Sequence, residues 1–226
     1  MSRTCVVPVR LGSKRLPRKN LLKLHGIELV ARALRRAKSA QVFDEIWLSS
    51  ESEVFEDIAH YEGVNFHLRE EWLGSDSATS EDFIGDFLRH HPTHFLIQLH
   101  SIAPLLSVEE ICSFVTEFER SGADSFFSVM STRLECLYLG SPVNFTLGTK
   151  TNSQDIQPVQ EIVWSITGWR ASSFLSTLNN EGCATYSGKL GFFPISRFGA
   201  HVIKTQEDLD VAAALLPLAE KHGRLL

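Results

Sequence analysis

The first predicted strand and the loop after it read VVPVRLGSKRLPRKN, residues 6–20. Residues 10–20 contain five cations and no acid, whereas 17 basic residues face 27 acidic ones in the rest of the chain. Ligands of open α/β sheets bind at the carboxyl ends of strands. Like charges this close repel each other unless an anion lies among them. The segment therefore predicts a polyphosphate site after the first strand; the alternative is a solvated basic loop.

Composition limits the class of protein and its partners. The chain has 226 residues, of which 43% are hydrophobic and 22% charged, as is typical of a soluble globular fold. A net charge of -5 argues against nucleic acid or a membrane surface as partner. The four scattered cysteines form no Cys-x-x-Cys pair, which favours free thiols in a reducing compartment. With no signal-peptide pattern and no apolar run of spanning length, we expect a cytoplasmic protein.

Strand and helix patterns alternate through the first part of the chain, which predicts an α/β fold with a mostly parallel, doubly wound sheet. The expected strands are Thr4–Val9, Phe43–Leu48, Val64–Leu68, His94–Leu99 and Ser125–Met130. The expected helices are Ile27–Ala40, a segment from Ser50 or Ser52 to Tyr61, Ser77–His90 with Thr79 or Ser80 as cap, and Ser107–Ser121.

The pattern changes at residue 132, where the chain becomes turn-rich and polar. We interpret residues 132–168 as an insertion of two-strand arms for dimer contact, within a single domain that spans residues 1–226. The elements expected from there on are a strand Ile162–Thr167, a helix Ala171–Leu178, a strand Gly191–Ile195 and a last helix capped by Thr205 with Asp208.

The basic loop is neither a Walker A loop nor a dinucleotide fingerprint, because Gly12 stands alone. Gly12 and Ser13 allow close backbone approach and offer donors to phosphate oxygens. Lys14 and Lys19 are separate point charges, and Arg10 provides a planar fork of donors. This chemistry suits several phosphates of one ligand.

These residues carry a resemblance to a known family. The pattern Pro8-x-Arg10-x-Gly12-Ser13-Lys14-Arg15-Leu16-Pro17-x-Lys19-Asn20 resembles the signature loop of cytidylyltransferases that activate acidic sugars, the CMP-sialic acid synthetase family and its relatives for other nonulosonic acids. Weaker collinear blocks follow at residues 46–53, 68–80, 100–106, 152–159 and 202–214. The resemblance implies a fold of the nucleotide-diphospho-sugar transferase type.

The resemblance also implies roles for individual residues. The CTP phosphates and ribose would be held by Arg10, Gly12, Ser13, Lys14, Lys19 and Asn20, with Lys19 and Arg10 as the catalytic cations. Arg69 and the segment Gly74, Ser75 and Asp76 would read the cytosine, and Gly74 would leave room for that approach. The alternative for Arg69 is a surface ion pair with Glu70 or Glu71.

The chain departs from the family pattern at the metal. Mg²⁺ is expected from the family, but Val202 and Lys204 stand at its two aspartate positions, and neither can ligate Mg²⁺. The strand end His100-Ser101-Ile102 supplies no acid either, so we assign no metal ligand. Lys204 would then be a fixed cation near the phosphates or, alternatively, a solvated residue. His90, His91 and His94 are interpreted as a surface cluster, because no carboxylate was recognised on the same face.

The acceptor side departs as well. The family's arginines for the sugar acid match Ser153 and Glu161. We assign substrate contacts to His100, Gln154 and Lys204, with Lys150 or Arg170 as alternatives to Gln154. The sequence does not identify the sugar.

By this resemblance the chain transfers CMP from CTP to an acidic, sialic-acid-like sugar, releases pyrophosphate and acts as a homodimer in cell-surface polysaccharide biosynthesis. Substituted metal positions leave open a catalytically silent nucleotide-binding relative that acts as a sensor or partner subunit. A purine- or uridine-sugar pyrophosphorylase is disfavoured, because its Gly-Gly-x-Gly-Thr-Arg-Leu loop is absent.

Overall fold

The β-branched run near the start of the chain forms an interior strand of the sheet. The computed structural model describes residues 1–221. Strand β1 (Arg3–Pro8) is buried along its middle and lies between two parallel neighbours. The sheet has seven strands in the order β11 (Leu190–Pro194), β7 (Ser125–Thr132), β10 (Val159–Arg170), β6 (Phe95–Leu99), β1, β4 (Glu45–Ser50) and β5 (Asn65–Leu68).

The expectation of a mostly parallel sheet is confirmed. Only β10 among these seven strands runs antiparallel to its neighbours β6 and β7. A register shift in β10 between Ile162 and Thr167 is held by Ser128, whose hydroxyl donates to the carbonyl oxygens of Val163 and Ile166. The carboxyl ends of β1, β4, β5 and β6 consequently meet at one edge of the sheet.

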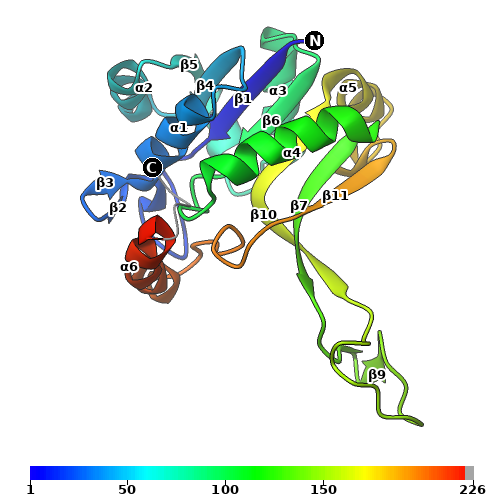
Figure 1. The fold of residues 1–226 in the computed structure, drawn as a ribbon. Coiled ribbons are helices and arrows are strands. Elements are labelled where there is room, and N and C mark those ends of the chain that lie inside the picture. The colour runs from blue at the N-terminus through cyan, green and yellow to red at the C-terminus, as the bar shows by residue number, and fades with distance from the viewer. Residues whose placement is uncertain (222–226) are drawn as a thin grey trace.

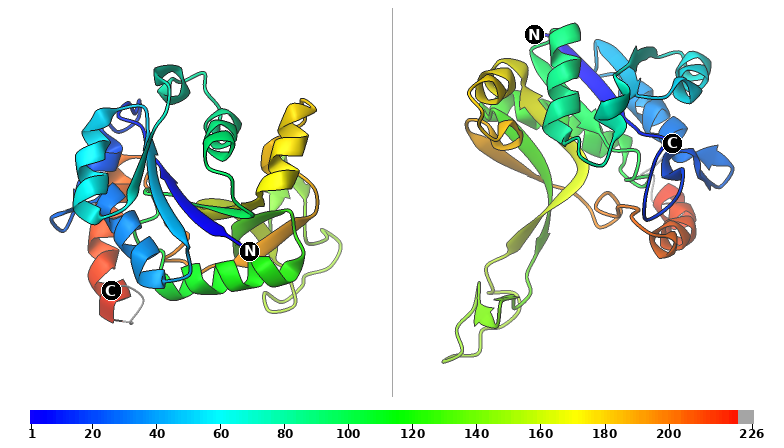
Figure 2. Two further views of the ribbon diagram at one scale, coloured as in Figure 1. Left: turned by 90° about the horizontal axis from the view of Figure 1, so that it is seen from above. Right: turned by 180° about the vertical axis from the view of Figure 1, so that it is seen from behind.

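Helices cover both faces of the sheet, as the views in Figures 1 and 2 show. The helices on one face are α1 (Leu29–Ala40), α2 (Glu56–Glu62) and α4 (Val108–Ser121). The other face carries α3 (Ser80–His90) and α5 (Ala171–Asn179). Each layer has its own apolar cluster against the strands. The last helix, α6 (Gln206–Lys221), packs on the loop after β1 through Leu16 and Leu24.

Three predicted caps are confirmed. Thr79, Ser107 and Thr205 each accept a hydrogen bond from the backbone N–H three residues later, and the carboxylate of that later residue accepts one from the backbone N–H of the cap. Of the two caps considered for α3, Thr79 is the correct one. Local side-chain chemistry therefore decided where these three helices begin.

Some predicted boundaries are wrong. Helix α1 begins at Leu29, because the two residues before it, β3 (Ile27–Glu28), pair with β2 (Lys23–Leu24) in a hairpin. The turn of that hairpin holds His25 at φ 46° and Gly26 at φ 81°. The segment expected as a helix from Ser50 or Ser52 instead starts with a 3₁₀ turn at Glu53–Phe55, and the side chain of Ser52 makes no cap bond.

A long arm leaves the body of the molecule. Strands β7 and β10 extend past the sheet as a two-stranded stalk, and residues 133–158 form its tip with the short pair β8 (Leu137–Tyr138) and β9 (Ser141–Pro142) (Figure 1). The predicted insertion of 132–168 is too long, because residues 166–168 pair with β6 inside the sheet. Within residues 1–221, no helix has the length and apolar character needed to cross a membrane.

Candidate active site

A cleft of about 570 Å³ lies where the parallel strands end. Its walls come from the loop after β1, from the segment after β5, from α3 and from the end of β6. The lining includes most residues predicted to bind the nucleotide: Arg10, Gly12, Ser13, Lys14, Lys19, Asn20, Arg69, Ser75 and Asp76. The fold therefore gathers at one place residues that lie up to 66 positions apart in the chain.

Lys19 is held in the cleft by the segment that precedes α6. Its Nζ donates to the carbonyl oxygen of Ile203 at 3.2 Å. Burial, followed by the positive charges of Arg15 and Arg10, lowers the pKa of Lys19. Among the described residues no carboxylate lies within ion-pair distance of Lys19. Its charge is thus available to an anion in the cleft.

Asn20 holds the shape of the loop. Its amide nitrogen donates to the Arg10 carbonyl oxygen at 2.9 Å, and its amide oxygen accepts from the Ser101 hydroxyl at 2.7 Å. The side chain is buried, so both bonds are shielded from water. Asn20 therefore ties the cationic loop to the end of β6, with its polar atoms engaged by protein rather than directed at a ligand.

The loop has a counter-acid that its own sequence does not contain. Asp76 lies 3.0 Å from Arg10 Nη1 and 2.8 Å from Lys14 Nζ. Hydrogen bonds from Lys14 and then from Arg10 hold the pKa of Asp76 below its usual value. Arg10 also donates to the carbonyl oxygens of Gly74 and Ser75 at 3.3 and 3.2 Å. The Gly74–Asp76 segment thus engages the cations of the loop, and its contact with a cytosine stays a prediction.

Arg69 forms a buried ion pair, but with neither of the residues considered from the sequence. Its Nη2 donates to Glu51 at 3.0 Å and to the Val9 carbonyl oxygen at 2.8 Å. Its Nε and Nη1 atoms are buried and make no hydrogen bond with the described residues. The guanidinium lies 5.0 Å from the ring centre of Phe83, which also lines the cleft. Arg69 is thus a fixed donor in the wall.

Glu51 is the residue that sequence reasoning missed. Besides Arg69, it accepts a hydrogen bond from the Leu11 backbone N–H at 2.8 Å and so anchors the start of the cationic loop. A Cβ at Gly74 would lie 2.4 Å from Glu51 Cδ, so the absence of a side chain at Gly74 leaves room for this carboxylate. A signal was available: Glu51 directly follows β4, at the sheet edge where the site lies.

His100 is the one predicted substrate residue that lies in the cleft. Its ring stands 6.0 Å from the ring of Trp164, and its Nε2 is buried without a hydrogen-bond partner among the described residues. Burial lowers the pKa of His100 to about 4. The ring is therefore neutral at neutral pH. It can contact a ligand through its flat surface and through Nε2, but it carries no charge.

The other acceptor residues lie elsewhere. Gln154 is exposed on the arm, where its carbonyl oxygen accepts from Arg133. Lys150 pairs with Glu135 on the same arm, and Arg170 lies 3.9 Å from Asp124. Lys204 is exposed beside Lys19, whose pKa its charge helps to lower. A single chain therefore does not bring these side chains together into an acceptor site.

The donor set does not fit a Mg²⁺ site of the two-aspartate kind. Val202 packs partly buried against the core, and the Lys204 N–H donates to Asp208. Asp208 caps α6, while the carboxylates of Asp76 and Glu51 are held by cations. Among residues 1–221, the carboxylates nearest the cleft are thus engaged by the protein itself.

Comparisons with known proteins show the family of this chain. A family model described as cytidylyltransferase matches residues 4–158. N-acylneuraminate cytidylyltransferase A of Danio rerio is 30% identical over 128 residues, which are 56% of this chain and 30% of that protein. Pseudaminic acid cytidylyltransferase of Campylobacter jejuni is 38% identical over 81 residues, 35% of each chain. The chain thus aligns with about a third of the length of these relatives.

Solved structures share the fold. The structure of CMP:2-keto-3-deoxy-manno-octonic acid synthetase complexed with CTP has a TM-score of 0.74 at 15% identity and covers 96% of this chain and 99% of that chain. A cytidylyltransferase from Leptospira borgpetersenii has a TM-score of 0.64 at 16% identity and covers 96% and 87%. Because the family model spans more than half of the chain, this protein belongs to the cytidylyltransferase family.

Proposed function

We propose that the protein transfers CMP from CTP to an acidic, sialic-acid-like sugar and releases pyrophosphate. The observation that carries this proposal is the cleft wall formed by the cationic loop. It holds the ammonium of Lys19, bonded to the Ile203 carbonyl oxygen but to no carboxylate among residues 1–221, and two Arg69 donors without a partner in that part of the chain. Support for the substrate class comes from relatives named for N-acylneuraminate and for pseudaminic acid.

The chemistry needs charge and position more than a covalent intermediate. A sugar hydroxyl oxygen attacks the α-phosphorus of CTP, the bond from that phosphorus to the bridging oxygen breaks, and pyrophosphate leaves. Lys19 and Arg10 neutralise the charge that builds on the phosphate oxygens. The hydroxyl proton passes to water, because a histidine with a pKa of about 4, as His100 has, is a weak base.

The nucleotide base would meet Arg69. Its Nε and Nη1 hydrogens match the acceptor edge of a cytosine, while the carbonyl oxygens of Gly74 and Ser75 are engaged by Arg10. The family usually uses a divalent metal. Lys204, near Lys19, supplies part of the positive charge at the position where the family has a carboxylate for that metal.

The test measures pyrophosphate release with CTP, ATP, GTP and UTP across several sugar acids. We expect release with CTP only, and a fall in kcat/KM of at least about 100-fold in Lys19→Met, typical of losing one charge-stabilising donor. Lys23→Met is the matched control, because Lys23 is 61% exposed and pairs with Glu28 outside the cleft. Equal activity in the two variants would contradict the proposal.

A second candidate follows from Val202 and Lys204 at the metal positions: a relative that binds nucleotide without turning it over. Calorimetry distinguishes the two candidates. Binding of CTP with no release for any nucleotide and sugar pair would favour the silent relative. Release with CTP would exclude it.

The arm is proposed to bind a second copy of the chain. Its tip exposes apolar side chains that a single chain leaves in water, with exposed fractions of 60% at Leu137, 72% at Tyr138, 88% at Leu139 and 81% at Leu147. In such a dimer Gln154, carried on the arm, would serve the partner's cleft. Sedimentation should show a dimer for the wild type and a monomer for Leu137→Asp/Leu139→Asp; a monomeric wild type would refute the dimer.

A further inference from the structure

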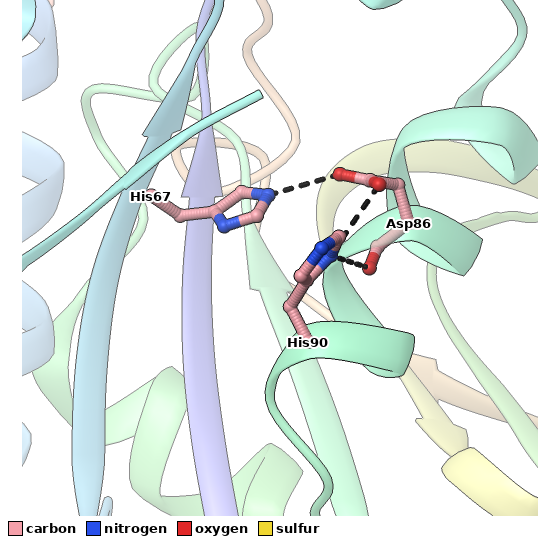
Figure 3. Close-up of side chains that lie close together, drawn as sticks. All are labelled: His67, Asp86 and His90. Atoms are coloured by element: carbon pink, nitrogen blue, oxygen red, sulfur yellow. Dashed lines mark hydrogen bonds and ion pairs between the residues drawn. The ribbon is translucent and has the colours of Figure 1, made fainter. Parts of the chain in front are cut away.

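Two imidazoles and one carboxylate meet between β5 and α3, outside the cleft lining. His67 Nε2 lies 3.0 Å from Asp86 Oδ2, and His90 Nδ1 lies 3.4 Å from Asp86 Oδ1. One ligand atom of each residue lies within 4.8 Å of the other two. Figure 3 shows Asp86 facing both rings. The nucleotide site uses none of these three side chains.

The fold explains the meeting and corrects an expectation from the sequence. Asp86 lies four residues before His90 on α3, so the two share one face of the helix. The expectation that no carboxylate shares a face with these histidines is therefore wrong for His90, although its ring is exposed as expected. His67 comes from β5, the edge strand of the sheet, against which this face of α3 packs. His94 lies apart and binds Ser2.

The donor set identifies the class of ion. Two imidazole nitrogens with one carboxylate oxygen suit Zn²⁺ and similar transition metals, whereas Mg²⁺ and Ca²⁺ prefer oxygen alone. Ligand atoms about 2.1 Å from one ion in a tetrahedron are about 3.4 Å apart. The distances are 3.0 Å from Asp86 Oδ2 to His67 Nε2 and 3.4 Å from Asp86 Oδ1 to His90 Nδ1, so each carboxylate oxygen lies near that distance from one ring, and one ligand atom of each residue lies within 4.8 Å of the other two. His90 Nδ1 also lies 2.9 Å from the backbone carbonyl oxygen of Asp86, and because the ring is 61% exposed it can exchange this contact for the ion.

Neighbouring side chains already fix the orientation of the His67 ring. The other ring nitrogen of His67, Nδ1, lies 3.0 Å from His91 Nε2. Metal-ligating histidines typically hydrogen-bond through their second nitrogen in this way, which fixes the ring and its tautomer. His91 is in turn held against Trp47, with ring centres 3.9 Å apart, and Phe87 meets the edge of His67 at 5.3 Å. His67 itself is only 8% exposed.

We propose that His67, Asp86 and His90 bind one divalent transition-metal ion, with Zn²⁺ as the best match. The ion is a structural cross-link between β5 and α3. These two elements also lead to the cleft wall, because Arg69 directly follows β5 and Phe83 lies on α3. The exposed side, at His90, leaves the remaining coordination position to water.

The experiment titrates untagged, metal-free protein with Zn²⁺ by calorimetry and follows thermal unfolding with and without Zn²⁺. We expect one Zn²⁺ per chain and a higher Tm in its presence. His90→Ala and Asp86→Asn should each weaken binding by at least about 100-fold, more than the 10- to 100-fold that losing an outer partner costs. His91→Ala should weaken it by about 10-fold. His60→Ala, an exposed histidine on α2, is the matched control and should bind as the wild type does.

Two results would overturn the proposal. One is a wild type that takes up no Zn²⁺ at micromolar concentrations. The other is Zn²⁺ binding that is equal in His90→Ala, Asp86→Asn and His60→Ala. Because His90 is exposed, its replacement leaves the fold intact, and the Tm without Zn²⁺ checks this directly. A loss of binding at an unchanged metal-free Tm therefore supports the site independently of any cytidylyltransferase activity.

Discussion

The Arg69–Glu51 pair tests how the cleft wall is held. The Arg69 side chain is 3% exposed and that of Glu51 11%, with 3.0 Å between Nη2 and Oε2. Removing one partner of a buried pair leaves an uncompensated charge and costs about 3–5 kcal/mol. In Arg69→Met, Glu51 keeps its bond from the Leu11 N–H, so we expect a loss near the lower limit, about 3 kcal/mol.

A double variant separates two costs of Arg69→Met: the unpaired charge left on Glu51 and the packing lost with the Arg69 side chain. Arg69→Met/Glu51→Gln replaces the carboxylate by an amide whose oxygen still accepts from Leu11. We expect it to regain about 2 kcal/mol relative to Arg69→Met alone, because contacting residues couple by such amounts.

Urea unfolding at neutral pH, followed by circular dichroism with linear extrapolation, measures both values. Arg197→Met, at an exposed position, is the control and should change the free energy of unfolding by less than about 0.5 kcal/mol. Two results would contradict this reasoning. One is that the free-energy changes of Arg69→Met and Glu51→Gln, measured separately, sum to that of the double variant. The other is that Arg69→Met costs less than about 1 kcal/mol.

Two further predictions concern the same cleft. Burial lowers the pKa of His100 from 6.5 to about 4. Between these two pH values the His100 ring is protonated in the unfolded chain and neutral in the folded chain. Stability should therefore fall as the pH drops from about 6.5 towards 4, by at most about 3 kcal/mol from this group, and His100→Gln should lack that part of the slope in unfolding curves; parallel curves for both proteins would contradict this. Gly74→Ala should destabilise by about 1–3 kcal/mol, because its Cβ would lie 2.4 Å from Glu51, whereas Gly12→Ala, whose Cβ meets nothing within 4 Å, should leave the unfolding midpoint unchanged. Equal midpoints for the two variants would argue against the close packing at Gly74.

The sequence predicted those parts of the fold that depend on residues close together in the chain. The strand before the basic loop, the alternation of strands and helices, and the caps at Thr79, Ser107 and Thr205 follow from side chains a few residues apart. The start of α1 did not follow, because residues 27 and 28 fit a helical period equally well. Only pairing with β2 across the turn at Gly26 makes them a strand. Tertiary context overrode the periodic pattern there.

Some residues of the candidate site could likewise be predicted from the sequence, and others could not. The cationic residues were visible as a cluster in one loop, but their partners come from other elements: Asp76 from the segment after β5, and Ile203 from the segment before α6. His67 and Asp86 belong to two elements whose packing no local pattern specifies. Residues that act through distant partners leave little trace in sequence spacing. Residues that share a loop or a helix face leave a clear one.

The pairing of Asp76 changes what the charged loop implies. From sequence, five cations without an acid seemed to require an anion, yet the structure gives Arg10 and Lys14 a carboxylate of their own. That carboxylate is 48% exposed, and water screens ion pairs this open and weakens them. A polyphosphate carries several charges and displaces one such carboxylate at small cost. Lys19 has a backbone carbonyl as its hydrogen-bond partner and no carboxylate within ion-pair distance among residues 1–221, so its charge is not neutralised there. The loop therefore remains open to an anion because its internal counter-charge is weak.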